Sequence, residues 1–116
     1  MPAGLITANI HDNTIGIPVS GMRVQLYWVE NHGEVLLRAA VTNTIGSTDT
    51  PLLDSHKMSA GAYKLVLHAG DYYASIHSPS RGFFDVLPVV FVVEDASVPV
   101  CVRVELSLDR YTVRMM

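Results

Sequence analysis

Three side chains able to do chemistry alternate with apolar residues near the end of the chain. A thiol, a guanidinium and a carboxylate follow one another at Cys101, Arg103 and Glu105. A two-residue alternation is typical of a strand buried on one face only, and at about 3.3 Å per residue these groups span roughly 13 Å. A guanidinium can stabilise an anionic oxygen, a carboxylate can move a proton and a thiolate can act as a nucleophile. The polar side of this strand is therefore the first candidate for a functional site.

Each of these residues also has an ordinary structural interpretation. Arg103 and Glu105 could form a solvated ion pair, which contributes little to stability. Cys101 could be inert, because a free cysteine often packs as a small apolar side chain. The spacing alone leaves both interpretations open.

The elements that would hold this strand are mostly strands themselves. Alternating or continuously apolar runs separated by Gly, Pro, Asn and Asp predict strands at 5–11, 22–29, 35–42, 61–68, 89–93 and 98–107, with a last strand from Tyr111. Segment 12–18 is predicted as a turn, segment 43–51 as a polar loop, and Asp71 to about His77 as the one short helix. Short strands at this regular turn spacing are typical of a β-sandwich.

Size and composition indicate one domain over residues 1–116. Hydrophobic residues make up 49% and charged residues 16%, so we expect an oligomer that covers part of the apolar surface. The net charge is −3 and the Lys and Arg residues are scattered, which argues against nucleic acid as a partner. No apolar run approaches the roughly 18 residues of a membrane helix, and no leader pattern is visible. We therefore expect a cytoplasmic protein with no membrane partner.

Sequence motifs for bound groups are missing. Four histidines lack the regular spacing of metal ligands, so we expect no metal site; they are His32, His56, His68 and His77. No phosphate loop, dinucleotide fingerprint or serine nucleophile elbow occurs, so we expect no cofactor. The single cysteine excludes an internal disulfide and fits a reducing compartment.

Several short segments, in order along the whole chain, resemble the 5-hydroxyisourate hydrolases and their relative transthyretin. They are Ser20-Gly-Met-Arg-Val-Gln-Leu-Tyr27, Pro51-Leu-Leu53, Gly61-Ala-Tyr63, Gly70-Asp-Tyr-Tyr73, Phe83-Phe84 and Val93-Glu-Asp95. The resemblance implies an all-β, transthyretin-like sandwich of two four-stranded sheets with one short helix. It also implies a homotetramer, a dimer of dimers, whose outward strand faces line a channel that holds small molecules.

The signature residues of the hydrolases are replaced in this chain. The family's Thr-His-Val-Leu-Asp has Asn9 at its histidine position, and the arginine of its Asp-Gly-Arg is Ser47. The family's His-Val-Pro-Leu-Leu-Leu-Ser aligns with 101–107, so Cys101 replaces the second histidine. Its closing Tyr-Arg-Gly-Ser corresponds, within one residue, to Val-Arg-Met-Met. Opening a hydroxyisourate ring needs a general base and a stabiliser of negative charge, which Asn, Ser and Cys do not reproduce. Hydroxyisourate hydrolysis is therefore not expected.

If the channel is retained, its wall carries a new set of reactive groups. Arg103 or Arg114 would hold an anionic or enolate oxygen, and His11 or Glu105 would act as general acid or base. His11 could instead be an ordinary surface or interface histidine. Charges enclosed between subunits are costly unless they are paired or functional, which favours the catalytic interpretation.

Further polar residues would complete this rebuilt site. Asn9 would orient the substrate, and Ser47 and Thr112 would lie close enough to bind it. Cys101 would be either a nucleophile or a packed neutral thiol.

Three functions follow from these alternatives. The first is a cofactor-free enzyme that catalyses hydrolysis, cyclisation or isomerisation of a small molecule. The second is a non-catalytic carrier of small ligands, like transthyretin, and the third is a structural or regulatory subunit. The guanidinium and carboxylate at Arg103 and Glu105 favour the enzyme, because a carrier of apolar ligands needs neither, and a carrier of anions explains Glu105 less naturally.

Overall fold

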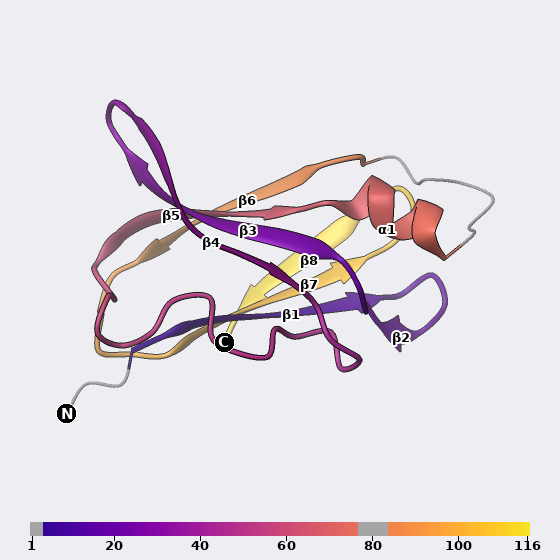
Figure 1. The fold of residues 1–116 in the computed structure, drawn as a ribbon, viewed down its shortest axis with the longest axis horizontal. Helices are drawn as coiled ribbons and strands as arrows, with labels where there is room; N and C mark the ends of the chain where they lie inside the picture. The colour runs from indigo at the N-terminus through magenta and orange to yellow at the C-terminus, as the bar shows by residue number, and fades with distance from the viewer. Residues whose placement is uncertain (1–3, 77–83) are drawn as a thin grey trace.

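The chain folds as two sheets packed face to face, as the computed structural model of residues 4–76 and 84–116 shows (Figure 1). The strands of the β1–β7 sheet are, in spatial order, β2 (Ile17–Pro18), β1 (Ile6–Asp12), β7 (Val100–Leu106) and β8 (Tyr111–Met115). The strands of the β3–β5 sheet are β4 (Gly33–Val41), β3 (Arg23–Glu30), β5 (Gly61–Leu67) and β6 (Leu87–Val93). Helix α1 (Ala69–Ser75) follows β5. The predicted sandwich of two four-stranded sheets with one short helix is confirmed.

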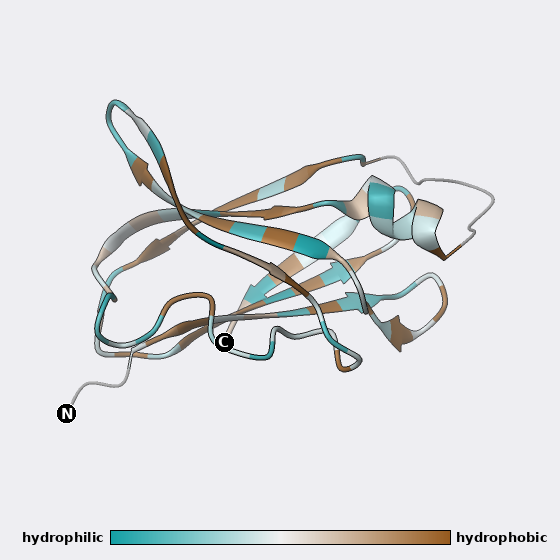
Figure 2. Ribbon diagram, viewed as in Figure 1, coloured by the Kyte–Doolittle hydropathy of each residue, from teal (hydrophilic) through white to brown (hydrophobic). Residues whose placement is uncertain are grey.

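Alternation of apolar and polar residues builds the core between the sheets. Buried and more exposed residues alternate along β1 and β6, and Figure 2 shows apolar and polar bands alternating along β3. Burying a valine, leucine or isoleucine side chain stabilises the fold by about 1.5–3 kcal/mol. The fully buried side chains come from both sheets and include Ile6, Ile10, Leu26, Tyr63, Leu65 and Val102. Because these residues point inward, the residues between them must point outward.

Strands β1 and β7 lie side by side in the middle of their sheet and run parallel. Their register runs from Ile6 opposite Val100 to Asp12 opposite Leu106. Parallel neighbours need a long connection, and here the whole β3–β5 sheet and α1 lie between them in the sequence. The pairing therefore brings residues from the two ends of the chain onto one face.

Helix α1 is tied to the end of β1 by a buried hydrogen bond. Asp12 is fully buried, and its Oδ2 accepts a hydrogen bond of 3.0 Å from the Tyr72 hydroxyl. Its Oδ1 accepts a bond of 2.9 Å from the backbone N–H of Thr14. Burial and the bond to Asp12 raise the pKa of Tyr72 well above its ordinary value of 10.0. This contact fixes where β1 ends and where the following turn begins.

Most predicted boundaries lie within two residues of the observed ones, and three differences stand out. The pair Ile17–Pro18, predicted inside a turn, forms the short edge strand β2. Proline is tolerated there because an edge strand has no neighbour on its open side that would need a backbone N–H donor. The helix begins at Ala69 rather than at Asp71, and both residues before Asp71 are buried against the sandwich. The predicted helix end at His77 lies outside the described residues. Strand β7 begins at Val100, and Val98, predicted to be inward, is half exposed before it.

Strand β4 has almost no buried residue and lies at the edge of its sheet. Its hairpin with β3 turns at Gly33 and projects beyond the body of the sandwich (Figure 1). No helix within residues 4–76 and 84–116 is long and apolar enough to cross a membrane.

Candidate functional site

The outward side of the β1–β7 sheet brings together all the side chains that the sequence singled out. We call it the polar face, and its residues are Asn9, His11, Ser47, Cys101, Arg103, Glu105, Thr112 and Arg114. Register pairs and one isolated bridge make a first row of Ser47, Asn9, Arg103 and Arg114. The second row is His11, Glu105 and Thr112. Neighbouring strands lie about 4.7–4.9 Å apart, so the members of a row are within reach of one small molecule.

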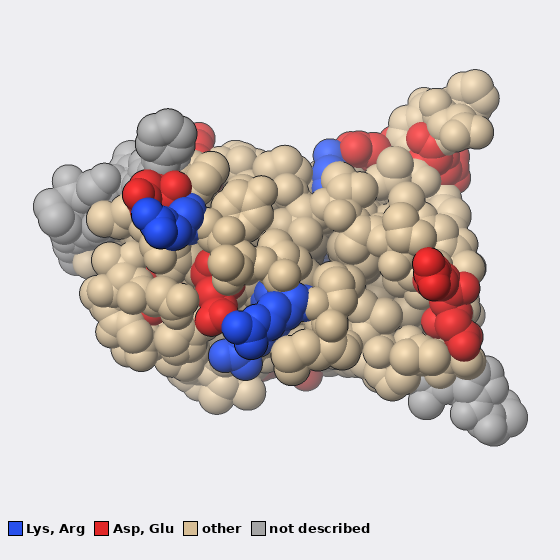
Figure 3. Space-filling view, turned by 180° about the vertical axis from the view of Figure 1, so that it is seen from behind, with Lys and Arg blue, Asp and Glu red and all other residues tan. Residues whose placement is uncertain are grey.

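Most of the polar face is half-buried in the single chain. The residues contributed by β1 and β7 are half-buried, whereas Thr112 and Arg114 on the edge strand β8 are exposed. Figure 3 views the molecule from behind and shows a group of basic atoms beside acidic ones, surrounded by a largely uncharged surface. Other charged atoms lie toward the edges of this view, so the central group is one of several on this side of the protein.

Arg103 and Arg114 stand directly opposite each other on β7 and β8. Within residues 4–76 and 84–116, the ion pairs are Lys64–Glu34 and Arg110–Asp109, so neither guanidinium of the polar face has a carboxylate within 4.0 Å. Like charges at directly opposed positions of a strand pair destabilise it. The polar face therefore holds two cationic groups whose charge the chain does not neutralise by direct contact.

His11 is held through one of its two ring nitrogens. Its Nδ1 lies 2.9 Å from Oδ1 of Asn13, which can only accept a hydrogen bond, so Nδ1 carries the hydrogen in this contact. In the neutral form of the ring, Nε2 then carries the lone pair that a general base requires. Glu105 is the register partner of His11 on the neighbouring strand, but in the described part of the chain its carboxylate makes no ion pair with the ring within 4.0 Å, so it would act on an imidazolium ion only as a nearby negative charge.

Asn13 was not predicted as a site residue. It lies in the turn after β1, two positions beyond His11, and its carboxamide reaches back to the ring. A histidine followed two residues later by a turn asparagine is the sequence signal that could have found it. Holding a base by a third group is a recurrent arrangement in enzymes that activate a nucleophile.

Asn9 of β1 is hydrogen-bonded to the loop after β4, which contains Ser47. The amide nitrogen of Asn9 donates to the Ile45 carbonyl at 3.1 Å and to Ser47 Oγ at 3.0 Å. Both amide hydrogens are therefore used, and Asn9 can serve a ligand only through Oδ1. Ser47 Oγ accepts this bond and keeps its own hydrogen for a further acceptor. Gly46 makes the close approach of this loop possible, because its φ is +81° and a Cβ there would collide with the Ile10 carbonyl.

Cys101 lies at the opposite end of the polar face from the base. Its register partner on β1 is Thr7, and its backbone exchanges two hydrogen bonds of 2.9 Å with Met116. Glu105 and the His11 beside it stand about 13 Å further along β7. Within residues 4–76 and 84–116 the register places neither His11 nor Glu105 beside the thiol, which favours a packed side chain over a nucleophile.

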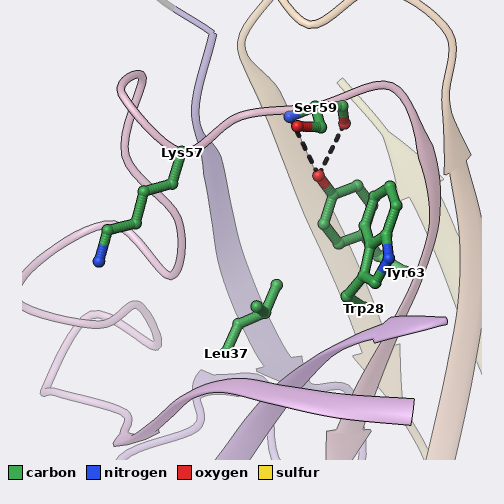
Figure 4. Close-up of a pocket in the computed structure, with 5 residues that line it drawn as sticks. All are labelled: Trp28, Leu37, Lys57, Ser59 and Tyr63. Atoms are coloured by element: carbon green, nitrogen blue, oxygen red, sulfur yellow. Dashed lines mark hydrogen bonds between the residues drawn. The ribbon is translucent and has the colours of Figure 1, made fainter. Parts of the chain in front are cut away.

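No group of three His, Cys, Asp or Glu side chains in the described part of the chain is close enough together to hold a metal ion. A pocket of about 240 Å³ lies elsewhere, lined by Trp28, Leu37, Lys57, Ser59 and Tyr63 (Figure 4). The Tyr63 hydroxyl donates to the Ser59 carbonyl at 2.7 Å and accepts from its N–H at 3.3 Å, which fixes one wall. None of these residues belongs to the polar face, so this pocket is separate from the predicted site.

Comparisons with known proteins agree on one family. The profile of the HIUase/Transthyretin family matches residues 6–113. The chain is 34% identical over 96 residues to 5-hydroxyisourate hydrolase 2 of Rhizobium meliloti (strain 1021), with 81% of this chain and 80% of that protein covered. It is 37% identical over 98 residues to the 5-hydroxyisourate hydrolase of Halalkalibacterium halodurans, with 82% of each covered.

Solved structures share the fold at lower identity. A crystal structure of (S)-allantoin synthase superposes with a TM-score of 0.90 at 23% identity, covering 98% of this chain and 44% of that one. This chain thus spans less than half the length of that protein. Transthyretin from Sparus aurata superposes with a TM-score of 0.85 at 20% identity, covering 96% of this chain and 95% of that one.

Proposed function

The chain belongs to the HIUase/Transthyretin family, and from this premise we propose that it is a small-molecule enzyme whose site is the polar face. The reaction would be a cofactor-free hydrolysis, cyclisation or isomerisation. The observation that carries the proposal is the His11–Glu105 register pair beside Arg103, with the ring of His11 held by Asn13. The names of the curated relatives support an enzyme of this family, and the replaced signature residues support a changed reaction.

The three reaction classes share one step that this geometry can perform. Nε2 of His11 takes a proton from a bound water or from an acidic substrate position, and the electron pair left behind forms or shifts a bond toward a carbonyl. The carbonyl oxygen becomes negative and is stabilised by the Arg103 guanidinium and by the Ser47 hydroxyl. Glu105 stabilises the imidazolium ion, which returns its proton in the next step.

We propose that the polar face is enclosed in a homotetramer. A half-buried face that concentrates charge is expected to gain function, and to lose water, when a second dimer covers it. Light scattering after size exclusion is expected to give four times the chain mass of 12.7 kDa. A chain that stays monomeric at high concentration would contradict the enclosed site.

The loss of hydroxyisourate hydrolysis is the first test of the changed reaction. Hydroxyisourate made in place by urate oxidation is expected to decay no faster with this chain than in buffer, with the Rhizobium meliloti relative as positive control. The triple variant Asn9→His, Ser47→Arg and Cys101→His restores the family residues and is expected to accelerate decay at least tenfold. Full activity of the unchanged chain, or an inactive but folded and tetrameric triple variant, would contradict this assignment of the face.

Proton exchange separates an enzyme from a carrier of small ligands. Cyclic imides and keto acids incubated with the chain in deuterated water are expected to exchange their acidic protons faster than in buffer, as followed by NMR. His11→Ala and Glu105→Gln should each lower this rate by about 10²–10⁴-fold, whereas Arg110→Gln, in an exposed loop pair, should not. Bound compounds that never exchange or react would identify a carrier instead.

A further inference from the structure

We propose that Arg103 and Arg114 together form a subsite for a carboxylate, so that the substrate of the proposed enzyme is a small monocarboxylic acid. The inference rests on the proposed function only in calling the ligand a substrate, because the subsite itself is argued from charge and register. The family motif places proline and leucine where this chain has Arg103 and Glu105. Arg103 and Glu105 are therefore features of this chain, whereas Arg114 lies within one residue of the arginine of the closing motif.

Two guanidinium groups at directly opposed positions repel each other unless an anion lies between them. Arg103 and Arg114 are register partners in an antiparallel pair, where opposed side chains start about 4.5–5.5 Å apart. Neither one is within 4.0 Å of a carboxylate in the described part of the chain. A bound anion between the two guanidinium groups would supply attractive electrostatic energy that offsets this repulsion.

Counting charges indicates what kind of anion fits. The polar face holds the two arginines and one carboxylate, Glu105, while His11 is neutral when Nδ1 alone carries hydrogen. Its sum is one positive charge, which a monoanion neutralises. A phosphate dianion would leave an excess negative charge close to Glu105. The balance therefore favours a carboxylate.

The shape of the two side chains agrees with this choice. An arginine presents two parallel N–H donors to the two oxygens of a carboxylate, which a lysine or a single hydroxyl cannot do. The same row offers the acceptor Oδ1 of Asn9 and the hydroxyl of Ser47 for polar atoms next to the carboxylate. These groups suit a hydroxylated or carbonyl-bearing acid better than a hydrocarbon acid.

The subsite lies next to the proton-transfer pair. His11 and Glu105 occupy the neighbouring row, two residues or about 7 Å along the strands. A carboxylate held by the arginines would therefore place an atom a few bonds away beside Nε2 of His11. The substrate class that fits is a small cyclic or linear acid whose reactive position lies a few bonds from its carboxylate.

Binding of benzoate tests the subsite without knowledge of the substrate. Calorimetric or NMR titration of the tetramer is expected to show benzoate binding at least tenfold more tightly than the neutral isostere benzamide, and more tightly than inorganic phosphate. Arg103→Gln and Arg114→Gln should each weaken benzoate binding at least tenfold, with Arg110→Gln unchanged as the matched control. Glu105→Gln should tighten it, because one negative charge is removed.

Opposite results would overturn the proposal. Equal binding of benzamide, tighter binding of phosphate, or benzoate affinity that survives both arginine substitutions excludes a carboxylate subsite. If Arg103→Gln fails to fold, the exposed position of Arg114 keeps the test available through Arg114→Gln.

One further variant separates this proposal from the proposed function. His11→Asn removes the base and is expected to abolish turnover while changing benzoate affinity far less than either arginine substitution does. If turnover requires His11 but benzoate affinity does not change in the arginine variants, the proposed enzyme is supported and the carboxylate subsite is excluded. If benzoate affinity depends on the arginines but no compound is turned over, the subsite is supported and the protein is a carrier of acids.

Discussion

The outward faces of the two sheets treat their charges in opposite ways. On the β3–β5 sheet, Lys64 of β5 lies 2.6 Å from Glu34 of β4 and 5.2 Å from the centre of the Tyr27 ring. On the β1–β7 sheet, Arg103 and Arg114 face each other and no carboxylate of the described chain contacts either one. The Lys64 charge is therefore paired within the chain, whereas the two opposed arginines have no carboxylate in contact within residues 4–76 and 84–116.

The contrast separates structural from functional charges in one molecule. A surface lysine that is paired with a carboxylate contributes little to stability and needs no bound anion to neutralise it. Two arginines at directly opposed positions lower the stability of their strand pair, and a bound anion would offset that cost. The location of His11 and Glu105 in the row beside these arginines, and not beside Lys64, agrees with a reaction on that face.

The same contrast between paired and unpaired groups exists inside the molecule, where the largest effect is expected. Tyr72 bonds to the buried Asp12, but the buried hydroxyl of its neighbour Tyr73 has no partner within residues 4–76 and 84–116. Tyr72→Phe should lower the free energy of unfolding by about 1.5–3 kcal/mol, because it leaves a buried carboxylate oxygen unbonded. Tyr73→Phe, the matched control, should change it by less than about 0.5 kcal/mol. Equal losses in urea unfolding would contradict the contrast.

The pH dependence of unfolding sharpens this comparison. Burial and Asp12 raise the pKa of Tyr72, so its contribution to stability is complete below the ordinary value of 10.0 and falls as the pH rises toward the folded pKa. Each such group steepens the loss by up to about 1.4 kcal/mol per pH unit. The difference in stability between the unchanged chain and Tyr72→Phe should therefore shrink above pH 10.0. A difference that stays constant would show that Tyr72 titrates normally.

Converting the arginine pair into an ion pair is expected to have an intermediate effect. Arg114→Glu places a carboxylate opposite Arg103 and replaces repulsion with attraction. Opposed charges on neighbouring strands contribute roughly 0.2–1 kcal/mol, so the variant should be more stable than the unchanged chain in urea. It should also fail to bind benzoate. A less stable variant would mean that the arginines do not repel each other.

The smallest effect is expected on the other face. Glu34→Gln removes the partner of Lys64, whose side chain is 21% exposed, and should cost no more than about 0.5 kcal/mol. The cost should disappear in high salt, because exposed charges are screened. Glu30→Gln, on the same hairpin and exposed, is the control. A loss as large as that of Tyr72→Phe would contradict a merely structural role for this pair.

Local alternation predicted the strands and the outward residues of β1 and β7, whereas the resemblance to a known family implied the two four-stranded sheets and the positions of Ser47 and Arg114. Arg103 and Glu105 alternate with buried valines, and Asn9 and His11 alternate with buried apolar residues of β1. An alternating strand has only one outward side, so these residues could be assigned to it without knowledge of their neighbours. The same logic failed at β2, where two residues join a sheet only because β1 lies beside them.

The arrangement within the face could not be predicted from local patterns. Register between β1 and β7 depends on contacts made across almost the whole chain, and it decides that His11 faces Glu105 and Asn9 faces Arg103. The hold of Asn13 on His11 depends on the shape of the turn after β1. The distance of Cys101 from the base likewise follows from register rather than from composition.

A crystal structure of the chain soaked with benzoate tests the central claim most directly, because it makes the polar face compete with the pocket of Figure 4. We predict the carboxylate between the guanidinium groups of Arg103 and Arg114, with the ring directed toward His11. A benzoate seated against Trp28 and Tyr63 with its carboxylate near Lys57, and none on the β1–β7 sheet, would contradict the account.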